Sequence, residues 1–131
     1  MGNRAVIAFG KKPTDIGIYL HWNGGHESVK AFCDATRALM ASRGPDDQYM
    51  PARLVQVIGN FMGGCLSVGL GQLQNLDTDN GDNGTFVVNP ETLEITERLH
   101  RCGDSTFNSE YYERVKASAL ESNRDIFKRT D

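Results

Sequence analysis

The sequence predicts a single α+β domain, with a mainly antiparallel sheet of about five strands and helices mostly on one face. Its 131 residues suit one domain, 1–131, with no linker. The hydrophobic share of 39% and the charged share of 24% are typical of a globular chain. The predicted elements follow the order β-β-α-α-β-β-β-α, which lacks the strand–helix alternation of a doubly wound parallel sheet.

The first two predicted strands are residues 4–9 and residues 16–22. The first is a short apolar run, and the turn-forming residues 10–15 join it to the second, which predicts an antiparallel hairpin. Side chains alternate along a strand, so Tyr19 and His21 should share one face of the second strand. The opposite, apolar face is then made by Ile16, Ile18, Leu20 and Trp22.

Two helices are predicted next, over residues 26–42 and from about Pro51 to Met62. Each has apolar residues at three- and four-residue spacing, the pattern of an amphipathic helix. The first stripe is Val29, Phe32, Cys33, Thr36, Leu39 and Met40, and the second is Leu54, Val55, Ile58, Phe61 and Met62. A proline suits the first turn of the second helix, and Gly63-Gly64 ends it.

The remaining strands are expected at residues 65–73, 85–88 and 92–99. Between the first two of these lie Asn80-Gly81 and Asn83-Gly84, which are typical of a hairpin turn. In the last strand, Leu93, Ile95 and Leu99 are expected to face inward. A final helix over residues 109–128 should pack on the sheet or on a partner chain through Val115, Ala119 and Ile126.

Charge and cysteine content narrow the function classes. The net charge of −3, from 14 basic and 17 acidic residues, provides no general attraction to nucleic acid or anionic lipid. No apolar run is long enough for a membrane helix and no signal peptide is evident, so we expect a cytoplasmic protein. Cys33, Cys65 and Cys102 are few and widely spaced, which predicts free thiols rather than disulfides or a zinc site.

The most distinctive segment is residues 19–26, where aromatic, imidazole and amide side chains precede a predicted helix. It suggests a ligand pocket or contact surface at this strand-to-helix junction, because helix N-termini carry free backbone N–H groups. The candidate binding residues are Tyr19, His21, Asn23, Gly24 and His26. The alternative is that Trp22 belongs to the core and the glycines only turn the chain.

A second candidate is the acidic segment 77–84, with Asp77, Asp79 and Asp82 as possible contact residues. It resembles a calcium loop, but the register of an EF-hand fails. Counted from Asp77, glycine takes the fifth ligand position and valine the twelfth. We therefore interpret it as a polar hairpin loop that offers an acidic contact surface.

No cofactor or metal is expected. His21, His26 and His100 lack the spacing of a zinc site. A cysteine nucleophile is not expected either, because Cys33 falls on an apolar stripe, where a thiol is inert.

The start of the chain resembles a loose group of small phage and mobile-element proteins. These open Met-Gly-Thr/Asn-Arg, and a later strand ends in Trp-Asp/Asn-Gly before a helix. The resemblance covers about the first 40 residues, and its matching residues are Met1, Gly2, Asn3, Arg4, His21, Trp22, Asn23 and Gly24. It implies a small inhibitor of a bacterial defence system, such as an anti-CRISPR protein.

Three functional hypotheses follow. The first is a non-enzymatic phage- or plasmid-borne inhibitor that binds and blocks a host protein or ribonucleoprotein complex, with a homodimer possible. The second is a binding protein for a small molecule or nucleotide signal, which would use residues 19–26. The third is a small hydrolase or transferase that pairs His21 or His26 with a carboxylate.

Overall fold

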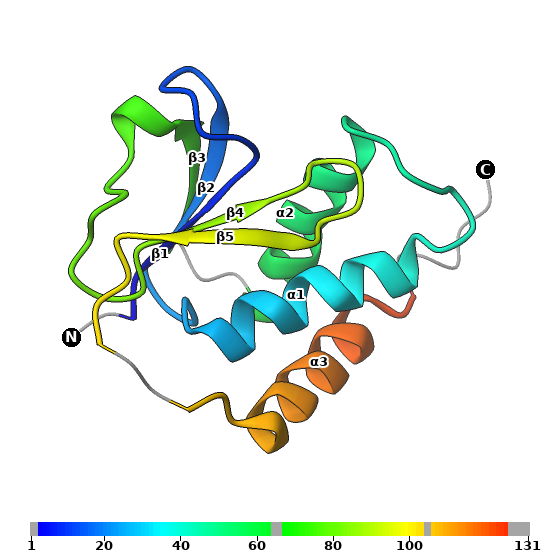
Figure 1. Cartoon of the computed structure of the whole chain (residues 1–131). Helices are drawn as coiled ribbons and strands as arrows, with labels where there is room; N and C mark the ends of the chain where they lie inside the picture. The colour runs from blue at the N-terminus through cyan, green and yellow to red at the C-terminus, as the bar shows by residue number, and fades with distance from the viewer. Residues whose placement is uncertain (1–2, 64–66, 104–105, 126–131) are drawn as a thin grey trace.

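A computed structural model describes residues 3–63, 67–103 and 106–125 of the chain. Figure 1 shows a sheet covered by helices. The elements are β1 (Ala5–Ala8), β2 (Ile16–Leu20), α1 (His26–Leu39), α2 (Tyr49–Met62), β3 (Val68–Gln72), the 3-10 helix η1 (Leu73–Asn75), β4 (Thr85–Val88), β5 (Ile95–Leu99) and α3 (Ser109–Asn123). This order differs from the predicted one, because η1 stands between β3 and β4.

The five strands form one mixed sheet in the order β3-β2-β1-β4-β5. The antiparallel pairing of β1 with β2 confirms the predicted hairpin. The expectation of a mainly antiparallel sheet was wrong, because β1 and β4 pair in parallel at the centre. The Asn-Gly pairs do not join neighbouring strands, because residues 76–84 carry the chain from β3, at one edge, to β4 on the far side of β1.

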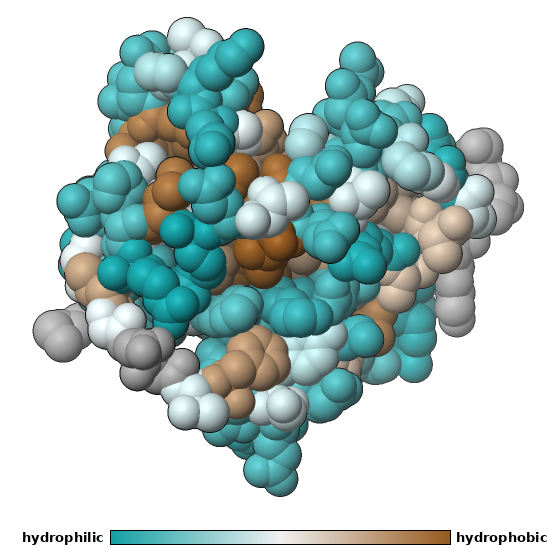
Figure 2. All heavy atoms as spheres, viewed as in Figure 1, coloured by the Kyte–Doolittle hydropathy of each residue, from teal (hydrophilic) through white to brown (hydrophobic). Residues whose placement is uncertain are grey.

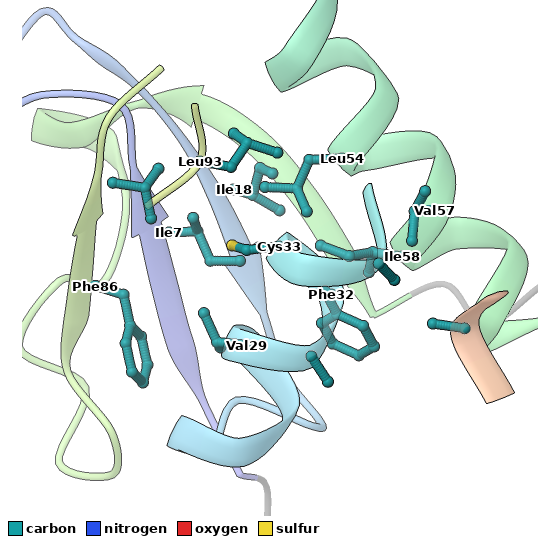
Figure 3. Close-up of a cluster of buried hydrophobic side chains, with 14 of the residues drawn as sticks. Ile7, Ile18, Val29, Phe32, Cys33, Leu54, Val57, Ile58, Phe86 and Leu93 are labelled. Carbon is teal, nitrogen blue, oxygen red and sulfur yellow. The ribbon is translucent and has the colours of Figure 1, made fainter. Parts of the chain in front are cut away.

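The main core lies between one face of the sheet and helices α1 and α2. Figure 3 shows Ile7 and Ile18 from the strands directed toward Cys33 and Leu54 from the helices. Each of these four side chains is 1% exposed or less. Cys33 therefore fills the core as a small apolar group.

Around Gly17, the opposite face of the sheet is covered by η1 and the segment that follows it. A Cβ on Gly17 would lie 2.7 Å from Leu73 Cδ2 and 3.2 Å from Leu76 Cδ1, so both leucines press on the strand there. This second layer explains why Val6 and Ala8 are also fully buried although they face away from α1.

One prediction for β5 was wrong. Leu93 is fully buried and Ile95 packs against the main core, as expected. A register shift between Val87 and Val88 then places Leu99 opposite Thr85, on the face away from the helices. Because a β-bulge inverts the alternation of side chains, Arg98 rather than Leu99 lies on the helix side, beside Phe86.

Helix α3 packs on α1 and α2 rather than on the sheet (Figure 1). Val115 is 5% exposed and Ala119 is fully buried in this contact, whereas Ile126 lies outside the described residues. The buried Asn123 joins α3 to α2, because it accepts a hydrogen bond from Asn60 (2.8 Å) and donates to the Val57 carbonyl (3.3 Å). None of the helices in the described ranges is long and apolar enough to cross a membrane.

Candidate functional site

Tyr19 and His21 lie at the end of β2 on the face away from α1. The Tyr19 hydroxyl and His21 Nδ1 are 3.0 Å apart, within hydrogen-bond distance. Both side chains are half-buried, whereas Ile18 and Leu20 on the other face are fully buried. The alternation of the strand therefore holds two polar ring side chains together at the surface.

Trp22 is exposed, with 42% of its surface accessible, so its interpretation as a core residue was wrong. Strand β2 ends at Leu20, and the backbone beyond it no longer directs alternate side chains into the core. The indole packs on the His21 imidazole, with ring centroids 5.1 Å apart and planes at 85°. The edge-to-face contact orients the indole at the surface.

The residues after Trp22 set the turn into α1. Asn23 has a left-handed backbone (φ 57°), and its side-chain amide reaches the Tyr111 hydroxyl at 3.5 Å. Gly24 is buried and donates its N–H to the Asn3 carbonyl at 2.8 Å. A Cβ there would lie 2.5 Å from that oxygen, so Gly24 permits close backbone packing rather than ligand contact.

The acidic segment is not an open hairpin loop, because it is tied to the start of β1. Asp82 accepts hydrogen bonds from Arg4 Nε (2.8 Å) and from the Arg4 backbone N–H (3.1 Å). These two bonds hold the pKa of Asp82 below its usual range. Asp77 lies 3.8 Å from the same guanidinium, whereas Asp79 extends toward His100 at 3.9 Å.

Asn80 organises this segment from inside. It is 3% exposed, and its amide donates to the carbonyls of Asp77 and Gly84. Its side-chain oxygen accepts the backbone N–H groups of Asp82 and Gly84. The two Asn-Gly pairs therefore form part of a closed polar loop. Every hydrogen-bonding group of the Asn80 side chain has a partner within this loop.

Arg4 connects the two predicted regions. Asp82 and Asp77 bind its guanidinium. Tyr19 and His21 lie close enough to interact electrostatically with this Arg4–Asp82 pair. Tyr19, His21, Asp77 and Asp82 are therefore brought together, although the sequence gives them as separate candidates. Sequence reasoning missed the role of Arg4 and of the exposed Tyr111. The isolated cation at the start of an apolar strand was the available signal for Arg4.

His26 lies elsewhere, between the rings of Phe86 (5.9 Å) and Phe107 (5.0 Å). Burial, together with the cations Arg98 and Arg101, lowers the pKa of His26, so the neutral imidazole is favoured. It lines one end of a groove of about 540 Å³ between α1 and β5. Figure 2 shows hydrophobic side chains in the hollow beside β5, with hydrophilic side chains around them.

The two histidines of residues 19–26 contact mainly aromatic side chains. His21 contacts a tyrosine hydroxyl and a tryptophan, and His26 contacts two phenylalanines. Within the described part of the chain, no three His, Cys, Asp or Glu side chains are grouped so that they could hold a metal ion.

In comparisons with known proteins, no family model, curated sequence or solved structure gives a significant match.

Proposed function

We propose that this protein acts by binding another protein through an aromatic surface formed by Tyr19, His21, Trp22 and Tyr111. One observation carries the proposal: the single tryptophan of the chain is exposed, while its neighbours hold it in a defined orientation. Burying a tryptophan on association would remove a large apolar area from water.

The composition of the surface suits a protein partner. Tryptophan, tyrosine and arginine are the residue types that most often dominate binding energy at protein interfaces. Tyr19 and His21 are already restrained by their mutual contact, so little side-chain entropy remains to be lost on binding. The Arg4–Asp82 pair beside them provides a polar border, which is typical of an interface rim.

The partner class rests on the sequence resemblance. The resemblance to phage and mobile-element proteins makes a bacterial defence complex the first partner to test, with the protein acting as an inhibitor.

The experiment measures phage plating on bacteria that carry a CRISPR–Cas system and express this protein. We expect wild type to restore plating and Trp22→Ala to lose most of that effect. Tyr49→Ala is the matched control, because Tyr49 is an aromatic residue with a similar exposure of 45%, located on α2. Thermal melts of both variants should stay close to wild type, which separates lost binding from lost folding.

Two results would contradict this proposal. If Trp22→Ala and Tyr19→Ala both retained full inhibition, the aromatic surface would not be the contact site. If wild type failed to restore plating against a panel of defence systems, a defence complex would be excluded as the partner. A cross-linker attached within the aromatic surface would then test for other protein partners.

The groove between α1 and β5 favours a second candidate, an anionic small molecule such as a mononucleotide. Of its cations, Lys30 and Arg37 are paired with Asp34, whereas Arg98 stacks on Phe86 and donates to the Asn83 carbonyl. A mononucleotide panel should raise the melting temperature of wild type but not of Arg98→Ala. An unchanged melting temperature of wild type across the panel would exclude this candidate.

A further inference from the structure

The two edge strands of the sheet differ in how they are protected from pairing with another chain. β5 carries Glu97 and Arg98 and lies next to a register shift, and charges and bulges of this kind discourage edge-to-edge contact. β3 has the sequence Val-Gly-Leu-Gly-Gln, with no charge or proline, and it pairs in even register with β2. Within the described residues, β3 is therefore the unprotected edge.

The ladder with β2 shows which backbone groups of β3 are free. The bonds His21 N–H to Ser67 carbonyl and Leu73 N–H to Asp15 carbonyl place the hydrogen-bonded pairs at Ser67 and Leu73. Because such pairs alternate along an antiparallel ladder, the backbone groups of Gly69 and Gly71 also form hydrogen bonds with β2. The N–H and C=O groups of Val68, Leu70 and Gln72 consequently point out of the sheet.

The side chains at this edge are apolar and exposed. Leu70 is 63% exposed and Ile16, its diagonal neighbour on β2, is 45% exposed. Both lie on the face of the sheet that carries Ile18, so they extend the buried face outward beyond the helices. An edge with free backbone groups and exposed aliphatic side chains is suited to the addition of another strand.

We propose that β3 pairs in antiparallel fashion with β3 of a second copy of this chain, with a two-fold axis at Leu70. Two glycines, Gly69 and Gly71, flank that residue symmetrically. Leu70 would face Leu70 of the second copy, Gly69 would face Gly71, and Val68 would face Gln72. The outward groups of the two strands would then form about six hydrogen bonds, and the two sheets would become continuous.

The charge distribution favours a second copy as the occupant. Each chain has a net charge of −3, so two copies carry the same overall sign of charge. The β3 edge is an exception, because neither β3 nor its flanking residues Ser67 and Leu73 carry a charge. The dimer would also place Tyr19 of both copies on the same face of the joined sheet. This inference does not depend on what the aromatic surface binds.

Sedimentation velocity over a concentration series tests the dimer. We expect wild type to dimerise as its concentration rises, and Leu70→Lys to weaken the association by about tenfold or more, because two ammonium groups would face each other at the axis. Thr96→Lys is the matched control, since it adds the same charge at an exposed position of the other edge strand. A wild type that stays monomeric throughout the series would overturn the proposal and leave the edge open to a strand of a different protein.

Disulfide trapping tests the register independently of any folding defect in Leu70→Lys. In a Cys65→Ser, Cys102→Ser background, Leu70→Cys should form a cross-linked dimer under mild oxidation, because directly opposite residues lie about 5.5 Å apart. Gln72→Cys should not, because its two copies would be about 13 Å apart along the strands. Equal trapping at both positions, or none at Leu70→Cys, would contradict the proposed pairing.

Discussion

At the residue scale, Gly24 and Gly25 are adjacent but have opposite tolerance for a side chain. A Cβ on Gly24 would lie 2.5 Å from the Asn3 carbonyl oxygen and 2.7 Å from Ala5 Cβ, so the start of β1 would have to shift. A Cβ on Gly25 would lie no closer than 3.6 Å to a neighbour.

We therefore expect Gly24→Ala to destabilise the fold by about 1–3 kcal/mol, the usual cost of overpacking. Gly25→Ala should change stability by less than about 1 kcal/mol. Urea denaturation of the two variants measures the difference. Equal stabilities of the two variants would show that the start of β1 can move enough to accommodate a methyl group at Gly24.

The described cysteines should differ sharply in reactivity. Cys33 is buried in the core, and burial raises the pKa of its thiol to about 12, so almost no thiolate forms at neutral pH. Cys102 is exposed. We expect iodoacetamide to label Cys102 and leave Cys33 unmodified until the protein is denatured, as peptide mass mapping would show. Rapid labelling of Cys33 in native buffer would contradict the core seen in Figure 3.

At the element scale, α3 is held to the other helices by a narrow apolar contact. Val115 is 5% exposed and faces α1 and α2, so an aspartate there would bury an unpaired charge. Val115→Asp should lower the free energy of unfolding by about 3 kcal/mol or more. Ala117→Asp, on the exposed side of the same helix, is the control and should cost less than about 1 kcal/mol. Similar melting temperatures for the two variants would mean that α3 is not docked through Val115.

Asp34 on α1 makes the attachment of α3 sensitive to acid. It accepts hydrogen bonds from Lys30, Arg37 and the Tyr112 hydroxyl of α3. Burial alone would raise the pKa of Asp34, but the bonds from Lys30 and Tyr112 and the nearby cations outweigh it, so the pKa is lowered.

A carboxylate whose pKa is lower in the folded state stabilises the fold above its unfolded pKa. That stability is lost as the pH falls through the folded value. We expect wild type to lose stability as the pH falls below about 5, and Asp34→Asn to lose less over the same range. Denaturation at a series of pH values measures both slopes, and parallel slopes would exclude Asp34 as a source of the acid dependence.

At the scale of the whole molecule, features set by neighbouring residues could be predicted from the sequence, whereas contacts between distant segments could not. The alternation along the predicted strand 16–22 indicated that Tyr19 and His21 share a face, because that depends only on strand geometry. The parallel contact of β1 with β4 depends on distant segments and leaves no local signal. The same holds for the Arg4–Asp82 pair, whose partners are 78 positions apart.

Trp22 and Leu99 show why extrapolation of a periodic pattern fails. Both were assigned to the core by continuing an alternation that the chain interrupts. For Trp22 the strand ends two residues earlier, and for Leu99 a bulge inverts the faces. The ends of strands and the positions of bulges are set by packing with distant segments, which single-residue preferences do not encode.

The central pairing of β1 with β4 has a consequence for how the chain is made. As the protein leaves the ribosome, β1 emerges long before the strand that completes its ladder, and the β1–β2 hairpin is too small to be stable alone. Nascent chains stalled before Thr85 has emerged should therefore remain sensitive to protease, and protection should rise abruptly once residues 85–88 are available. Early protection would show that β1, β2, α1 and α2 fold as an independent unit, which would leave β4 to be added to a preformed sheet.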